Sequence, residues 1–186
     1  MSLRGDALLA EVRRAHPTAL VDDCHDKCCK LVLDALPQRV ILKGESLEEL
    51  LPDRLRASLD RDKMPDRIAM VPDGEWVHLA VVELKRGRFN ARHAALQVSN
   101  GVAVAERVLA QAGADFGRVV PYAFIAHGGG VRPQDMVEIG KIEPAFRKRR
   151  RRIRLKHCGE RFRAILTREA PSYTPLGSGK ATSRER

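Results

Sequence analysis

Two acidic residues and a lysine stand at a spacing that could support metal-dependent hydrolysis of a phosphodiester bond. Asp66 follows Pro65, and sixteen residues separate it from the tripeptide Glu83-Leu84-Lys85. Such hydrolysis needs an activated water molecule and stabilisation of the charge that grows on the phosphate, and Mg²⁺ held by oxygen ligands supplies both. Two carboxylates are sufficient if water and phosphate complete the coordination. A lysine beside them can orient the water or neutralise the phosphate.

A β-hairpin is the element that must position these side chains. Alternating apolar residues precede a Pro-Asp-Gly turn at 72–74, and a second alternating run extends over 76–84. This pattern predicts two antiparallel strands. The period of two places Glu83 and Lys85 on one strand face, beside apolar residues. Asp66 opens the first strand, so both carboxylates are expected at the same end of the hairpin.

Two alternatives to this metal site follow from the same residues. Asp73 also comes after a proline, but Gly74 follows it directly, so a hairpin turn is the better interpretation of that pair. The second alternative is that Glu83 and Lys85 form a solvated strand end and Asp66 is a turn residue. Against it, both charges extend an apolar face, and charges in such a place need a reason.

The remaining segments predict an α/β fold, in which a mixed β-sheet core is flanked by helices. The expected helices are 3–15, 18–36 and 91–112, and the expected strands outside the hairpin are 39–43 and 118–126. Segment 44–63 has a capping-box pattern at Ser46 and Glu49 and is expected to be a helical surface insertion. His127 and three glycines predict a turn, and 131–146 is expected to be irregular or partly extended.

The Pro-Asp pair and the later Glu-Leu-Lys resemble the motif of the PD-(D/E)xK nuclease superfamily. The resemblance extends over residues 18–126 in the order of the predicted elements. It implies a restriction-endonuclease-like fold for the α/β core. It also implies hydrolysis of phosphodiester bonds with Mg²⁺ (or Mn²⁺) as the cofactor.

The same resemblance assigns roles to individual residues. Asp66 and Glu83 would bind the metal together with the backbone carbonyl of Leu84, and Lys85 would be the catalytic lysine. Many members add a glutamine from the following helix, a role that Gln97 would take.

Two features of the family pattern stay open in this chain. RecB-like members carry a tyrosine four residues after that glutamine, whereas position 101 here is glycine. Many members also use an acid or a histidine from the first core helix, and several are available: Asp22, Asp23, His25 and Asp26. Acids followed by lysine four residues later are also ordinary surface pairs, so none of these is assigned a catalytic role.

The positive charge of the chain is concentrated in one segment. The net charge is +10, and residues 147–156 hold eight of the 34 Lys and Arg, so the rest of the chain balances to 26 − 24 = +2. A local cationic segment fits a polyanionic partner, most simply nucleic acid. The alternatives are a solvated face or a localisation signal. The residues expected to contact phosphate are Arg147, Lys148, Arg149, Arg150, Arg151, Arg152, Arg154 and Lys156.

The cysteines and the hydropathy pattern indicate where the protein works. No apolar run reaches the 18 residues of a membrane span, and the N-terminus lacks the apolar segment of a signal peptide. We therefore expect a cytoplasmic protein without membrane association, and reduced cysteines. Cys24 and Cys28 fall on the apolar face of the helix expected at 18–36, so core packing is favoured over a zinc or iron–sulfur site.

Together these features predict a metal-dependent nuclease, with DNA as the expected partner. Residues 1–170 would form one domain with its core at 18–126, and residues 171–186 a disordered tail. The resemblance also allows a homodimer, because family members commonly dimerise to cut both strands. The alternative is a non-catalytic nucleic-acid-binding protein that keeps the nuclease scaffold.

Overall fold

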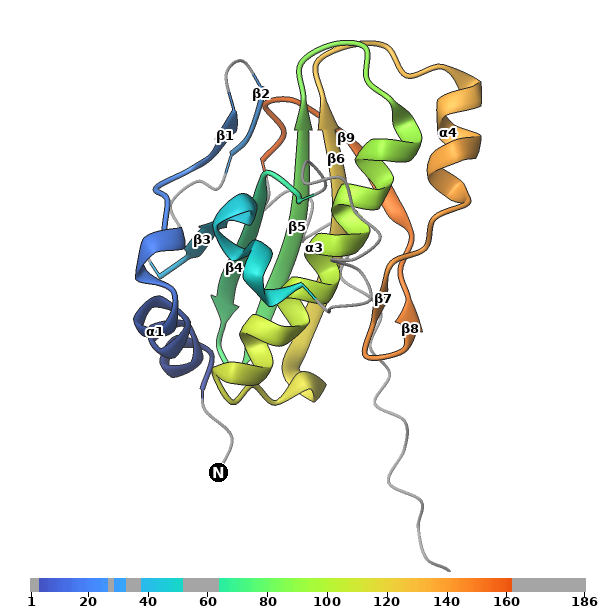
Figure 1. The fold of residues 1–186 in the computed structure, drawn as a ribbon. Coiled ribbons are helices and arrows are strands. Elements are labelled where there is room, and N and C mark those ends of the chain that lie inside the picture. The colour runs from blue at the N-terminus through green and yellow to red at the C-terminus, as the bar shows by residue number, and fades with distance from the viewer. Residues whose placement is uncertain (1–3, 27–28, 33–37, 52–63, 162–186) are drawn as a thin grey trace, which may run out of the picture.

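A five-stranded mixed sheet forms the centre of the computed structural model, which describes residues 4–26, 29–32, 38–51 and 64–161 (Figure 1). The strand order is β3-β4-β5-β6-β9. The strands are β3 (Val40–Lys43), β4 (Arg67–Asp73), β5 (Trp76–Lys85), β6 (Val119–His127) and β9 (Ile153–His157). β4 is antiparallel to both β3 and β5, whereas β6 and β9 continue the sheet in parallel with β5. The α/β prediction is therefore confirmed at the level of a mixed sheet with flanking helices.

The hairpin of β4 and β5 follows from its turn and its apolar alternation. Asp73 pairs with Trp76 across the turn, and Gly74 has a φ of +60°, a conformation that glycine adopts without steric cost. In β5, Val77, Leu79 and Val81 are buried on one face of the sheet, and Ala80 and Val82 are buried on the other. Because both faces are covered, a shift of one residue would bury the wrong set of side chains, so the register is strongly specified.

Helices cover one face of the sheet. Figure 1 shows α3 (Ala91–Gln111) lying along β5 and β6, with α1 (Gly5–Ala15), η2 (Gly44–Leu50) and α4 (Pro133–Gly140) around it. Asn90 caps α3 by accepting a hydrogen bond from the backbone N–H of His93, and Gly113, with φ of +75°, follows its end. The small residues of α3 let it approach the sheet closely, and the shared core includes Val81, Ala95, Val98, Ala105 and Ile125.

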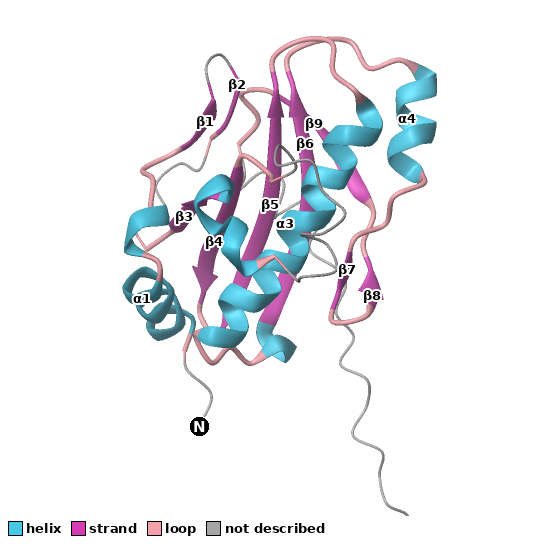
Figure 2. Cartoon of the chain, viewed as in Figure 1, coloured by secondary structure: helices cyan, strands magenta, loops and turns pink. Residues whose placement is uncertain are grey.

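A small hairpin contributes to the opposite face, where a helix was expected. Residues 18–36 do not form a helix in their described part: η1 (Pro17–Ala19) is followed by β1 (Cys24–Asp26) and β2 (Cys29–Leu31), as Figure 2 shows. Tertiary pairing overrides the helical periodicity. The backbone N–H of Val21 donates to Ile41, and the N–H of Gly159 donates to Lys30.

A disulfide holds this hairpin to the end of β9. Cys29 and Cys158 are joined with their Cα atoms 5.0 Å apart, although they stand 129 positions apart in the chain. The prediction of reduced cysteines is therefore wrong for this pair. Cys24 is a free, fully buried thiol packed in the core, as predicted, and burial raises its pKa to about 12. Cys28 lies outside the described residues.

Three further expectations can be compared with the structure. Segment 131–146 contains the helix α4, so the irregular assignment is wrong for that part; Pro133 begins the helix, and the Asp135 carboxylate accepts a hydrogen bond from the backbone N–H of Arg132. In segment 44–63, η2 starts at Gly44 without a side-chain cap, and Leu47 is buried in the core, so this part is not a surface insertion. Residues 52–63 and the tail at 171–186 lie outside the described residues.

No helix within the described part of the chain combines the length and the apolar composition that crossing a membrane requires.

The Cys29–Cys158 disulfide should contribute strongly to stability, since it closes a long loop. Replacing Cys158→Ser is expected to lower the free energy of unfolding by about 2–5 kcal/mol, because the unfolded chain gains the entropy of an open loop. Urea unfolding with and without dithiothreitol measures this. Reductant should destabilise the wild type and leave the variant unchanged. Equal stability of the oxidised and reduced wild type would contradict the expectation.

Candidate active site

The open end of the β4–β5 hairpin brings Asp66 and Glu83 together. Arg67 pairs with Val82, so continuing the register one step places Asp66 opposite Glu83. The backbone N–H of Asp66 donates to Oε2 of Glu83 at 3.2 Å, and the backbone N–H of Leu84 donates to Oδ2 of Asp66 at 2.7 Å. Each carboxylate thus reaches across to the other strand. The sequence-based expectation that these two acids meet is met by the geometry.

Lys85 and Gln97 extend this contact toward α3. The ammonium group of Lys85 forms an ion pair with Oε1 of Glu83 and donates to Oε1 of Gln97 at 3.3 Å. Nε2 of Gln97 in turn donates to the backbone carbonyl of Met64 at 3.0 Å. Gln97 is buried on the side of α3 that faces the sheet. All four predicted side chains therefore belong to one connected group.

Glu83 is the most strongly perturbed member of the group. Its side chain is 1% exposed, and burial raises the pKa of its carboxyl to about 8, with the nearby charge of Asp66 acting in the same direction. Lys85 opposes this shift through its charge and its hydrogen bond. A buried carboxyl with a second carboxyl beside it is an arrangement that a divalent cation would stabilise.

The donor set fits a hard divalent cation such as Mg²⁺ or Mn²⁺. Two carboxylates supply oxygen ligands, and Leu84 can add a third. In an extended strand the N–H and C=O of one residue point to the same neighbouring strand. Because the N–H of Leu84 binds Asp66, its carbonyl also faces that side. Among the described residues no group of three or more His, Cys, Asp or Glu could hold a metal, so water or phosphate would have to complete the coordination.

Two glycines allow the segment before Asp66 to lie close to the sheet and to α3. A Cβ atom on Gly101 would lie 2.3 Å from Cγ of Pro65 and 2.6 Å from Cγ1 of Val81. A Cβ atom on Gly44 would lie 1.8 Å from the carbonyl oxygen of Pro65. Position 101 thus has no room for the tyrosine that RecB-like nucleases carry. Pro65 fills that space instead and fixes the start of β4.

Sequence reasoning missed two histidines that lie beside this group. His127 ends β6 directly opposite Lys85, and His157 ends β9 directly opposite His127. Their rings lie 4.8 Å apart, and Nδ1 of the buried His127 contacts the carbonyl of Gly129 at 2.5 Å. The carboxyl ends of parallel strands meet at one edge of a sheet, and this rule could have placed His127 near Lys85 had the pairing been known.

Other acidic candidates lie elsewhere. Asp73 is in the turn at the far end of the hairpin, exposed and 3.5 Å from Nε2 of His78. Asp23 and His25 contact Arg67 through their backbone carbonyls and are themselves exposed. Asp22 is also exposed, and the side chain of Asp26 lies outside the described residues. None of the described ones is joined to Glu83.

The basic segment at 147–156 is split between a hairpin and a strand. β7 (Ala145–Phe146) and β8 (Arg149–Arg150) form the hairpin, and β9 follows. Described acids neutralise part of it, in the pairs Arg147–Glu106, Arg150–Glu143 and Lys156–Glu160. The segment starts at the opposite end of the sheet from Glu83, so it is not a single cationic surface around the candidate site.

Searches against protein-family models, curated proteins and solved structures find no match for this chain. What the chain does is therefore inferred from its own residues and their geometry.

The raised pKa of Glu83 predicts how the stability of the metal-free protein depends on pH. Between about pH 4.5 and pH 8 the native state retains a proton on Glu83 that the unfolded chain has released. This group should therefore lower the free energy of unfolding by up to about 1.4 kcal/mol for each unit of rising pH. Glu83→Gln lacks this contribution. The free energy of unfolding of both proteins is measured with urea, in EDTA, across this pH range. The value for the variant should increase relative to that of the wild type as the pH rises. An unchanged difference between the two proteins would contradict the raised pKa of Glu83.

Proposed function

We propose that this protein is a metal-dependent nuclease with a restriction-endonuclease-like core. The observation that supports it best is the reciprocal contact of Asp66 and Glu83 across the hairpin end, with Lys85 bound to Glu83. A solvated strand end would not bury a carboxylate to 1% exposure beside another carboxylate. The mixed sheet flanked by helices is compatible with that core.

The proposed mechanism assigns a separate task to each side chain. Asp66, Glu83 and the Leu84 carbonyl would hold Mg²⁺ or Mn²⁺, which supplies a Lewis acid for the phosphate and a water of lowered pKa when bound. Lys85, released from Glu83, would orient the attacking water or stabilise charge on the phosphate. Gln97 positions Lys85, because its amide is itself anchored on the Met64 carbonyl.

Nucleic acid is the proposed substrate, and DNA is the expected form. Arg149 and Arg151 form no ion pair with a residue that the structure describes and could contact phosphates, and such contacts give affinity without sequence choice. The second candidate function is a non-catalytic nucleic-acid-binding protein on the same scaffold. It would use the same basic residues but would have no need of the buried acidic pair.

Cleavage assays with a matched pair of aspartate variants test the proposal. Plasmid and single-stranded DNA are incubated with Mg²⁺, Mn²⁺ or EDTA. Asp66→Asn and Glu83→Gln should each lower the cleavage rate at least about 100-fold, because loss of a metal ligand removes several kcal/mol of transition-state stabilisation. Asp73→Asn, which alters the other Pro-Asp pair in the exposed turn, should cleave like the wild type.

Thermal unfolding of all three variants shows whether they are folded. Absence of metal-dependent cleavage by the wild type, or equal cleavage by Glu83→Gln, would reject the enzyme and leave the binding protein. Loss of activity in Asp73→Asn as large as in Asp66→Asn would show that the wrong aspartate has been chosen.

A further inference from the structure

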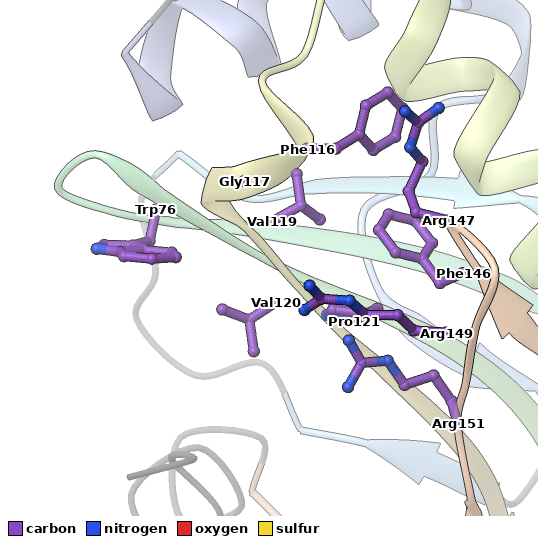
Figure 3. A pocket seen from close by; sticks show the side chains of 10 residues that line it. All are labelled: Trp76, Phe116, Gly117, Val119, Val120, Pro121, Phe146, Arg147, Arg149 and Arg151. Carbon is purple, nitrogen blue, oxygen red and sulfur yellow. The ribbon is translucent and has the colours of Figure 1, made fainter. Parts of the chain in front are cut away.

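A second polar feature lies at the end of the sheet farthest from Glu83. A cavity of about 440 Å³ opens where β5 and β6 begin, and Figure 3 shows the side chains that line it. Trp76 lies on one side of the opening, and the guanidinium groups of Arg149 and Arg151 lie on the other (Figure 3). The volume is within the range of sites that hold small organic ligands.

Arg149 and Arg151 converge on this cavity without a described counter-charge. Figure 3 shows both side chains directed toward the cavity, Arg149 from β8 and Arg151 from the residues just after it. Neither forms an ion pair with any residue that the structure describes, and Nε of Arg151 is buried without a hydrogen-bond partner there. Burial and the charge of Arg149 both lower the pKa of Arg151. An anion placed between the two guanidinium groups would relieve both effects.

The wall of the cavity is held in a costly conformation. The two-residue turn between β7 and β8 has φ values of 50° at Arg147 and 63° at Lys148, where glycine or asparagine is usual. Left-handed backbone at such residues costs about 1–2 kcal/mol each. Packing fixes the turn: the Arg147 guanidinium lies 4.7 Å from the ring centre of Phe116, and its backbone N–H donates to Glu106. Backbone strain of this kind concentrates at functional sites.

The remaining lining selects for more than an inorganic anion. Trp76 offers an aromatic surface, and Val120 and Pro121 offer apolar surface beside the two guanidinium groups. Aromatic side chains bind the flat face of a nucleobase whatever its identity. A flat, apolar group attached to a phosphate matches this lining.

We propose that this cavity binds a nucleotide unit, with the phosphate on Arg149 and Arg151 and the base against Trp76. Trp76 begins β5 and Lys85 ends it, so the cavity lies about 30 Å from the candidate active site at about 3.3 Å per residue. One nucleotide cannot contact both. The cavity is therefore a second site, and its occupation does not depend on nuclease activity.

The nucleotide unit can come from two sources that share this chemistry. One is a free mononucleotide. The other is a strand whose phosphates pass from the cavity to Glu83. At about 3.4 Å per stacked nucleotide, a stacked strand needs about nine nucleotides to span both sites. Length dependence therefore separates the two sources.

The single tryptophan of the chain provides the measurement. Fluorescence of Trp76 is followed in EDTA with Glu83→Gln as the background, so that no strand is cut. Titration with AMP should change the emission saturably, and adenosine or inorganic phosphate should bind more weakly than AMP. Arg149→Gln/Arg151→Gln should weaken AMP binding at least about tenfold, because two charge-assisted contacts are lost.

The matched control is Arg150→Gln/Arg152→Gln, which removes the same charge from the alternate positions of the segment. Arg150 and Arg152 do not line this cavity, so AMP affinity should stay within about twofold of the background protein. Unfolding temperatures confirm that each variant is folded. An equal loss of AMP affinity in both double variants would show that only the total positive charge of the segment matters, and it would overturn the proposal.

Two further outcomes would also overturn it. If inorganic phosphate binds as tightly as AMP, the base contributes nothing to binding. If Trp76 emission shows no saturable change with AMP or with any strand, the cavity does not bind a nucleotide. Two strands are compared, one about twice as long as the nine-nucleotide span and one shorter than that span. Tighter binding of the longer strand identifies a nucleic acid that spans both sites. Equal affinities of AMP and both strands identify a free nucleotide. Binding with no cleavage by the wild type would reject the proposed nuclease and keep this inference.

Discussion

The register of the β4–β5 hairpin is the constraint on which the candidate site depends. Asp66 meets Glu83 only because Arg67 pairs with Val82. A slip of one residue would turn Glu83 into the opposite core, among Ala80, Val82 and their neighbours. The Pro-Asp-Gly turn and the two covered faces of the sheet both oppose that slip. The fold therefore specifies the position of the carboxylates through apolar packing, before any polar contact forms between them.

Packing of α3 against the sheet then completes the group. Gly101 brings the helix within contact of Pro65 and Val81, and this approach sets Gln97 beside Lys85. Gly44 also lies close to Pro65. Together with the short side chains of α3, it holds the segment before Asp66 in place. Burial disfavours the charged form of the Glu83 carboxyl, as its raised pKa shows. The packing of α3 therefore stabilises an arrangement that is electrostatically unfavourable without a cation.

Sequence reasoning succeeded where local pattern and tertiary structure agree. The hairpin, α1, α3, β3 and β6 all follow from apolar periodicity with turn or cap residues at their ends. It failed at 18–36, where the spacing of Cys24 and Leu31 fits both a helix and the observed strands, and where Leu20, expected on the apolar helix face, is exposed. The deciding contacts for that segment come from β3 and from Cys158, far along the chain. Local periodicity cannot predict pairing between segments that lie far apart in the chain.

The same distinction applies to the candidate site. Asp66, Glu83 and Lys85 could be chosen from spacing because they lie on one hairpin, whereas Gln97 required the family resemblance. His127, His157 and the two close-packed glycines could not be chosen, since their places depend on parallel pairing and on the helix–sheet distance. The basic segment was visible in composition, but its division between a hairpin and a strand was not.

Distance separates the two charged regions of the molecule. A Debye length is about 8 Å at physiological ionic strength, so the roughly 30 Å between the ends of β5 exceeds three of them. The guanidinium groups of Arg149 and Arg151 therefore do not act on the Glu83 carboxyl, whereas Lys85, which contacts it, lowers its pKa. The separation also keeps the arginines from pairing with Asp66 and Glu83. In the two proposed sites, a cation would bind at one end of the sheet and a phosphate at the other.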